Sequence, residues 1–446
     1  GNINVLASAG LEVSLSSLGG FAGSINVPYT SASLSATLVY VRITSTAPQG
    51  AINGTITNSG GGAASNAVVT VTGGVFQNYY NTKAILGLQN TGSWSSTIAG
   101  SGASPANFTD AYQLFNIINQ AGAIYTGVWN VTGAGNSSRV IVGNGTDPLL
   151  FTVLPGIDSV TSATRIDVLN NGVLALQNNR RPFLNSLATG STVAFAQTGL
   201  STADTIRPPA ISYYNLVLSD GIKILSPGTT TVRGNLVVNS VQNFNGATSN
   251  PFSTIKLSGN FDFLNAGSFE PSPAGDNGRI TLEISNPIGT PTITGNGTDM
   301  LLFRLRTDSS TTPFPQVQLT GSTNLVLGNP SGGGLQLNIP AASAPVAVFN
   351  IGSGSRLSLV AGAASTTSAR GLIETNGGNI SVLKSTGTTN GGTLRFSPTS
   401  LLNNLTIAFD AAFARDSIFI ADDVPVTGSL TLTKGKIVVA SGKTLS

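Results

Sequence analysis

Carboxylates are the main reactive groups of this chain, whose 446 residues include 18 Asp and Glu but no His and no Cys. A Ser-His-Asp triad, a cysteine nucleophile and nearly all zinc sites are therefore excluded. Glycoside hydrolases need two carboxyl groups roughly 5–10 Å apart. The only adjacent acidic pair, Asp422 and Asp423, precedes Val424-Pro425, a context that favours a turn. We predict that the protein is not an enzyme; a polysaccharide-active β-helix enzyme is the weakest of the alternatives.

Two nearly identical nine-residue words, at 143–151 and 295–303, hold the second set of possible ligands. Each contains Gly-Asn-Gly-Thr-Asp, and its aspartate, Asp147 or Asp299, is a hard oxygen ligand of the kind that Ca²⁺ accepts. Calcium sites usually combine two or three carboxylates, whereas each word has one. Because Asn-Gly strongly favours a turn, we expect two turns, no metal site and no cofactor.

The similarity between the two regions extends beyond these words. Residues 166–176 align with residues 317–327 at nearly the same offset. Recurrence on this scale is typical of duplicated supersecondary blocks that stack on one another to share a core. We therefore predict duplicated blocks near 138–200 and 290–360.

The composition indicates a folded chain with an uncharged polar surface. Charged residues make up 9% of the chain, against about 25% in average globular proteins, while 40% of residues are apolar. Such a chain can bury a core and is not of the disordered type. A net charge of +3, thinly spread, predicts no nucleic-acid partner. No apolar run approaches the roughly 20 residues of a membrane-spanning helix.

Residues 1–75 alternate between short apolar strands and Gly, Pro, Ser and Asn turns, which predicts an Ig-like β-sandwich. The expected strands are 3–7, 11–16, 24–29, 37–44, 51–57 and 67–73. A sandwich of this type has about seven strands, so we predict that one is missing. Residues 76–123 lack such a pattern and are predicted to be a connector, with 109–118 as its one helix candidate.

Residues 124–446 contain a long succession of four- to six-residue apolar segments separated by turn residues. An Asn-Leu pair opens several of them, at Asn215, Asn235, Asn324 and Asn404. We expect the Asn to cap exposed backbone at a corner. The following Leu should point inward and stack on the inward aliphatic side chain of the next segment. The pattern predicts an elongated β-solenoid or β-helix, with an array of β-sandwiches as the alternative.

Several of these segments resemble the β-strand-repeat surface proteins that Bacteroidota export by type IX secretion. The repeat-like segments are Tyr213–Ser219, Gly234–Val238 and Val426–Ile437, and those that resemble the accompanying Ig-like module are Gly10–Ser14, Val39–Arg42 and Gly54–Gly61. The resemblance implies an extracellular adhesin, stalk or filament component at the bacterial cell surface. It also implies O-glycosylation at Asp-Ser/Thr-aliphatic sites, with Ser159, Thr205 and Ser417 as the acceptors.

The missing strand suggests how copies of the chain would join. An incomplete sandwich exposes unpaired backbone groups that a strand from another subunit can fill. The C-terminal residues Lys436, Ile437, Val438, Val439 and Ala440 are the predicted donor strand, and repeated head to tail this contact builds a homopolymer. The alternative is that the strand is missing only because residues before Gly1 were removed or are not included.

The predicted function is therefore an extracellular structural protein that forms a surface filament or stalk. A non-polymerising adhesin that binds glycans or cell surfaces is the second hypothesis. Trp94 and Trp129 could stack on sugars in such a protein, although burial is the commoner fate of scarce aromatic residues.

Overall fold

The computed structural model describes residues 1–30, 35–62, 64–82, 87–119, 128–153, 159–177, 182–196, 207–239, 241, 243–245, 252–264, 280–285, 289–302, 304–307, 316–328, 334–337, 347–360, 371–384 and 391–446. These residues form an all-β fold with several sheets, which confirms the predicted class. Their helical turns are the 3-10 segments η1 (Thr91–Ser93), η3 (Ala134–Asn136) and η5 (Ala411–Phe413). None of the described segments is a helix of the length and apolarity that crossing a membrane requires.

The chain divides into two compact units. Unit 1 comprises Gly1–Ile141 and Thr161–Ile166, and unit 2 comprises Val142–Val160 and Asp167–Ser446.

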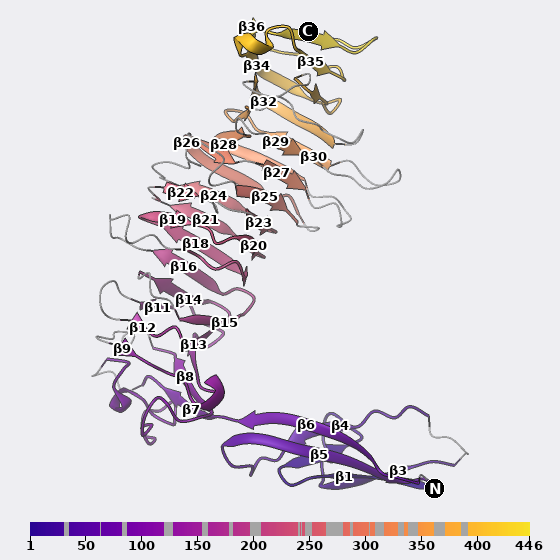
Figure 1. Ribbon diagram of the computed structural model, residues 1–446, viewed down its shortest axis with the longest axis vertical. Coiled ribbons are helices and arrows are strands. Elements are labelled where there is room, and N and C mark those ends of the chain that lie inside the picture. Colours follow the sequence, from indigo (N-terminus) through magenta and orange to yellow (C-terminus); the bar gives the residue numbers. More distant parts are fainter. Residues whose placement is uncertain are drawn as a thin grey trace. The chain divides into compact units, whose positions relative to one another are not determined.

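The six strands expected in residues 1–75 are all present in unit 1 (Figure 1). Their bounds are β1 (Asn2–Ala7), β2 (Leu11–Ser14), β3 (Ser24–Pro28), β4 (Tyr40–Ile43), β5 (Gly50–Gly60) and β6 (Ala67–Val75). They form a four-stranded antiparallel sheet in the order β3-β1-β5-β6 and a two-stranded sheet of β2 and β4. A core of alternating aliphatic side chains joins the strands, namely Val5, Leu11, Val13, Val27, Ile52 and Ile56.

Unit 1 continues with β7 (Gln77–Tyr80), β8 (Gln113–Ile117), β9 (Val128–Trp129) and all but the last residue of β10 (Arg139–Val142). β8 lies between β7 and β10 and pairs with β7 in parallel. The helix predicted at 109–118 is therefore wrong. In β8, Gln113, Phe115 and Ile117 are buried and alternate with partly exposed residues, a period of two that favours a strand.

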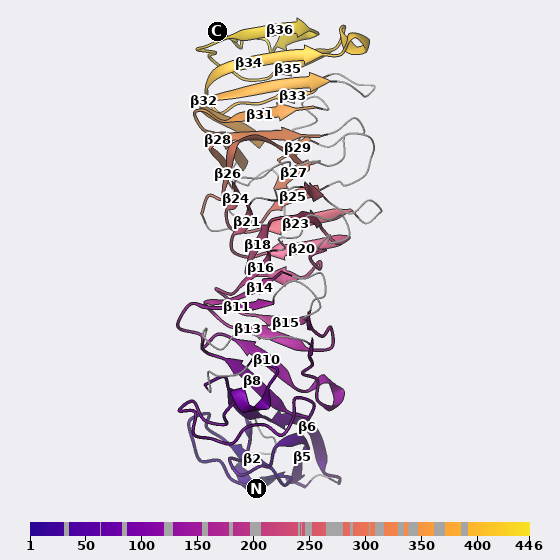
Figure 2. The ribbon, with the colours of Figure 1, turned by 90° about the vertical axis from the view of Figure 1, so that its left-hand side faces the viewer.

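Unit 2 is dominated by one thirteen-stranded sheet in which the described strand pairings are all parallel (Figure 2). Its strands are β11 (Leu149–Val153), β14 (Gly172–Leu176), β16 (Thr192–Ala196), β18 (Asn215–Ser219), β21 (Leu236–Asn239), β24 (Phe261–Leu264), β26 (Thr292–Leu302), β28 (Val317–Leu327), β30 (Ala347–Ile351), β31 (Arg356–Leu359), β32 (Gly371–Lys384), β34 (Leu401–Phe409) and β36 (Leu430–Lys434). Successive neighbours in this sheet follow the order of the chain, apart from β31, which pairs with both β28 and β32.

Smaller parallel sheets accompany the large one. Six strands form one of them, β17 (Ser212–Tyr213), β20 (Gly228–Val232), β23 (Ser253–Leu257), β25 (Ile280–Ile284), β27 (Arg304–Thr307) and β29 (Gly334–Gln336). Two others contain β19 (Ile222–Ile224) with β22 (Asn243–Asn245), and β33 (Thr393–Leu394) with β35 (Ser417–Ile420) and β37 (Lys436–Val439). The remaining short strands are β12 (Ser159–Val160), β13 (Arg165–Val168) and β15 (Phe183–Leu187).

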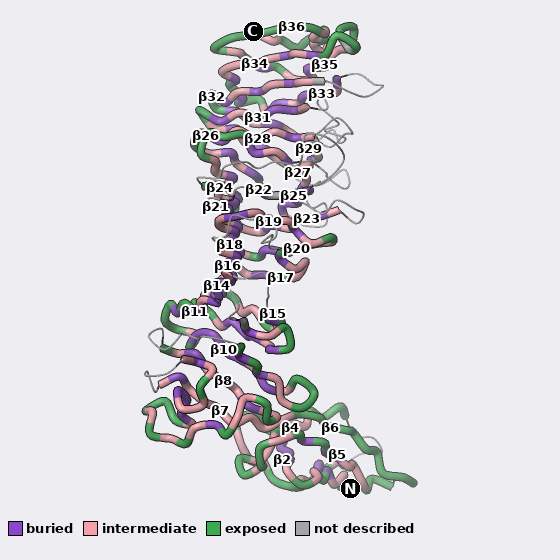
Figure 3. The backbone as a smooth tube through the Cα atoms, turned by 60° about the vertical axis from the view of Figure 1, so that its left-hand side comes forward, coloured by how far each residue is buried: buried purple, intermediate pink, exposed green. Residues whose placement is uncertain are grey.

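The core of unit 2 is a stack of buried apolar residues, each paired in register with its counterpart on the next strand (Figure 3). One such series runs through Val193, Leu216, Leu236, Phe261 and Ile293. Every member is at most 1% exposed. Since each burial removes a whole aliphatic or aromatic side chain from water, at roughly 1.5–3 kcal/mol apiece, the stack is the main source of stability in this unit.

The predicted Asn-Leu pattern is confirmed at the corners. Asn215 Oδ1 accepts a hydrogen bond from the backbone N–H of Asn235 at 2.9 Å, and Asn235 Oδ1 accepts one from Asn260 at 3.0 Å. The leucines that follow the four predicted asparagines, Leu216, Leu236, Leu325 and Leu405, are all 0% exposed. Asn215, Asn235 and Asn404 therefore each satisfy a backbone donor of the following turn, whereas Asn324 Nδ2 donates to Gly297 O at 2.6 Å.

Candidate functional site

Two outermost strands, β36 and β37, form the surface of unit 2 on which the assembly prediction rests. In the described strand order, β36 has β34 as its neighbour and β37 has β35. Both pairings are parallel, with Leu405 opposite Leu430 and Ile418 opposite Ile437. We call the free side of these two strands the terminal edge.

Apolar side chains of the terminal edge are exposed where their counterparts one strand earlier are buried. Leu430 is 51% exposed and Leu432 is 48% exposed, whereas their partners Leu405 and Ile407 are both 0% exposed. On β37, Val438 is 39% exposed, but so is its partner Phe419, so the contrast is limited to β36. The exposure therefore follows from the lack of a covering strand in the described structure, since the sequence pattern itself is that of the core.

The backbone of β36 also has groups that no described strand satisfies. Leu405 N donates to Ser429 O at 3.0 Å, so Ser429 and Thr431 direct their ladder groups toward β34. In a parallel ladder the intervening residues, Leu430 and Leu432, direct theirs the other way. The terminal edge thus combines unpaired backbone groups with exposed leucines, which makes it a template for another strand.

The structure places the predicted donor strand in β37, the edge strand of its own sheet. Lys436 pairs with Ser417 and Val439 with Ile420, and Ala440 N donates to Ile420 O at 2.9 Å. One side of this segment is therefore occupied by β35. Its other side belongs to the terminal edge, so the segment is held in place and offers an edge for pairing.

Residues after β37 are fastened to unit 2 through Asp423. Its carboxylate accepts hydrogen bonds from Lys443 Nζ at 3.0 Å and from Thr444 N at 2.8 Å. These bonds, the one from Lys443 first, lower the pKa of Asp423. The next carboxylate, of Asp422, accepts from Phe396 N at 3.0 Å and lies 3.5 Å from Arg395 Nε.

The acidic pair therefore has structural partners on both members. A general acid requires a carboxyl group that holds its proton, usually through a raised pKa. The pKa of Asp423 moves in the opposite direction. Among the described residues, no group of three or more acidic side chains is placed to hold a metal ion.

Both repeated words contain turns closed by their asparagine. Asn144 Oδ1 accepts from the N–H groups of Thr146 and Asp147, each at 2.9 Å. In the second copy Asn296 Oδ1 accepts from Thr298 N at 3.1 Å. The glycines between them, Gly145 and Gly297, have φ of +85° and +93°, values that Gly adopts at little cost.

The predicted glycosylation residues have different surroundings. Ser417 opens β35 and is partly buried, and Gly391 N donates to its carbonyl oxygen at 2.7 Å. Ser159 opens β12. Thr205 lies outside the described residues.

Unit 1 has a free edge at β6. This strand pairs with β5 in an antiparallel ladder from Gly50↔Val75 to Asn58↔Ala67 and ends the sheet order. Consecutive residues Val68 and Val69 are 58% and 55% exposed, so both faces of the strand meet solvent. An exposed, uncharged edge with β-branched side chains is favourable for strand pairing.

Trp94 and Trp129 are buried, at 0% and 1% exposure, and so they are not open stacking platforms.

Comparisons of the chain with protein-family models, curated proteins and solved structures find no match.

Proposed function

We propose that unit 2 is a β-solenoid and that residues 1–75 form an Ig-like β-sandwich. The solenoid is supported by parallel, in-register pairing between strands about 25 residues apart and by corner asparagines that bond across the same interval. The sandwich is supported by the two antiparallel sheets that share one aliphatic core. A fold of this kind presents repeated surfaces and edges, and the carboxylates of Asp422 and Asp423 have structural partners.

On this basis the protein is an extracellular structural component that forms a filament or stalk at a bacterial cell surface. The observation that carries the proposal is the terminal edge, where the core pattern continues into β36 but Leu430 and Leu432 remain about half exposed. Covering these leucines would bury apolar area and pair the backbone at once. Both contributions favour association.

The partner at the terminal edge is a second copy of the same chain, joined head to tail. β6 is the receiving strand because it has a side that no described strand pairs with, exposed Val68 and Val69, and no charged residue. A contact between two different surfaces of the same protein is heterologous. Such a contact builds an open filament when the rotation between successive copies does not close a ring. Filaments are the result.

The test is the molar mass of the full chain in solution, measured by light scattering across a range of concentrations. In the variant Leu430→Lys/Leu432→Lys, charged side chains occupy the surface that a second copy would cover, a device that natural edges use against pairing. We expect wild-type mass to rise with concentration and the variant to remain monomeric.

Thr431→Lys is the matched control. Thr431 lies between the two leucines, and the alternation of a strand directs its side chain to the opposite face. This variant should associate as the wild type does. Monomeric wild type at every concentration, or equal association of all three proteins, would contradict the proposal.

A further inference from the structure

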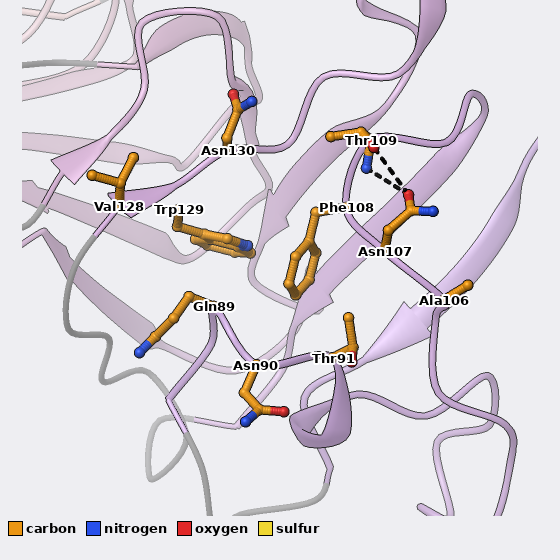
Figure 4. A pocket seen from close by; sticks show the side chains of 10 residues that line it. All are labelled: Gln89, Asn90, Thr91, Ala106, Asn107, Phe108, Thr109, Val128, Trp129 and Asn130. Atoms are coloured by element: carbon orange, nitrogen blue, oxygen red, sulfur yellow. Dashed lines mark hydrogen bonds between the residues drawn. The ribbon is translucent and has the colours of Figure 1, made fainter.

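A pocket of about 510 Å³ lies within unit 1 (Figure 4). Three short segments supply its lining, Gln89–Thr91, Ala106–Thr109 and Val128–Asn130. Its volume is in the range of pockets that hold small organic ligands. No Asp, Glu, Lys or Arg is among the lining residues, so the pocket suits an uncharged ligand.

A cluster of aromatic rings, of which Trp94 and Trp129 are buried, fixes the base of the pocket. Trp129 stacks on Trp94, with 5.8 Å between centroids, and meets Phe108 edge-on at 5.9 Å. Trp94 Nε1 donates to Leu88 O at 2.8 Å, which anchors the cluster to the segment that bears Gln89. Such packing holds the three lining segments in place before any ligand arrives.

Three asparagines of the lining have their carbonyl oxygens engaged by the protein. Asn90 Oδ1 accepts from Gly92 N at 2.8 Å, and Asn107 Oδ1 accepts from Thr109 N at 2.8 Å. The third, Asn130 Oδ1, accepts from the Thr161 hydroxyl at 2.6 Å. For Asn90 and Asn107 the donors are backbone N–H groups, which identify the bonded atom as oxygen and so fix the orientation of the amide.

These bonds leave the Nδ2 donors of the three asparagines. Within the described part of the chain, none of the three NH₂ groups has a protein acceptor. Figure 4 shows the Trp129 and Phe108 rings between these amide side chains. Phe108 is partly exposed and Val128 is 60% exposed, so the pocket joins hydrogen-bond donors to an apolar wall.

We propose that this pocket binds a neutral saccharide. Sugar hydroxyl and ring oxygens accept hydrogen bonds from amide NH₂ groups, while the C–H face of the ring packs on Phe108 and Val128. The binding site is independent of the assembly proposed above, since every residue that it uses belongs to unit 1 and none belongs to β6.

Tryptophan fluorescence gives a direct test, because the chain has two tryptophans and both belong to this cluster. The full chain is titrated separately with cellobiose, lactose, maltose and N,N′-diacetylchitobiose. We expect a saturable change in emission with at least one of them.

The decisive variant is Asn90→Asp/Asn107→Asp. Aspartate keeps the oxygen that accepts the backbone N–H groups but removes both NH₂ donors, so the turns remain closed. The expected effect is a loss of affinity of at least tenfold, the order expected for removing polar partners of a ligand. Asn296→Asp, which makes the matching change in an exposed turn of unit 2, should bind as the wild type does.

A second variant guards against misfolding. Val128→Asp alters a side chain that is already 60% exposed and places a charge on the apolar wall, and it should also weaken binding about tenfold. Circular dichroism verifies that each variant is folded. The proposal is overturned if none of the four sugars gives a saturable change, or if the folded variants bind as tightly as the wild type.

Discussion

At the level of single residues, this chain relies on amide side chains where many proteins use charges. Asn215, Asn235 and Asn404 each accept a backbone N–H of the following turn, and this role could be predicted because Asn favours corners and precedes an inward Leu. The buried lysine at position 223 could not be predicted. It occupies the centre of the short strand β19, where sequence alone does not distinguish an inward from an outward polar residue.

Lys223 should make stability depend on pH. The side chain is 0% exposed, its Nζ donates to Asp220 O, and burial lowers its pKa from the usual 10.5 to about 8, although Asp220 opposes the shift. Between these values the unfolded chain binds more protons than the folded one, so the free energy of unfolding rises with pH. The full shift of the Lys223 pKa corresponds to a change of about 3 kcal/mol in the free energy of unfolding.

The variant Lys223→Met should lack this rise. The free energy of unfolding of both proteins is measured with urea at pH 7 and at pH 10.5. The difference between wild type and variant is then compared at the two pH values. The exposed residue Lys434 provides the control variant Lys434→Met, which should retain the wild-type dependence. The same dependence in wild type and Lys223→Met would rule out this role for the lysine.

At the level of elements, parallel strands of unit 2 are joined by side-chain ladders as well as by backbone pairing. Lys256, Glu283 and Arg306 occupy paired positions on β23, β25 and β27. Glu283 is buried and lies 2.7 Å from Lys256 Nζ, and Arg306 Nε donates to it at 2.7 Å. One carboxylate therefore connects three strands.

Removing this carboxylate should lower the stability of the fold more than removing one partner of an ordinary surface ion pair does. Glu283→Ala leaves two cations facing each other across a buried position, and we expect the free energy of unfolding to fall by about 2 kcal/mol. This is below the range for fully buried pairs because both cations are about one-third exposed. Glu283→Gln, which keeps hydrogen-bonding capacity, should lose less. Urea unfolding midpoints measure both, and a change under about 0.5 kcal/mol for Glu283→Ala would show that the ladder adds little.

The incorrect helix at 109–118 also belongs to this level. The segment contains helix formers such as Ala111, Gln113 and Leu114, yet tertiary packing determines its conformation. Phe115 stacks edge-on against Trp94 at 5.1 Å and is 0% exposed. Intrinsic propensity is a weak guide where an aromatic cluster selects alternate residues.

At the scale of the whole molecule, local patterns predicted all six strands in residues 1–75 but missed β7 and β8 in the segment predicted as a connector. The order of strands in each sheet and the saccharide pocket could not be predicted. In unit 2, strand order depends on pairings between residues 19 to 32 positions apart, as the pairs Val173–Thr192 and Phe261–Ile293 show. The pocket depends on three segments that only the folded chain brings together.

Electron microscopy of the full-length chain tests the central claim, assembly through the terminal edge, most directly. Negatively stained wild-type protein at high concentration should contain unbranched filaments, and Leu430→Lys/Leu432→Lys should contain single particles. Thr431→Lys should form filaments as the wild type does. Single particles in the wild-type sample, or filaments that persist in the double variant, would contradict the account.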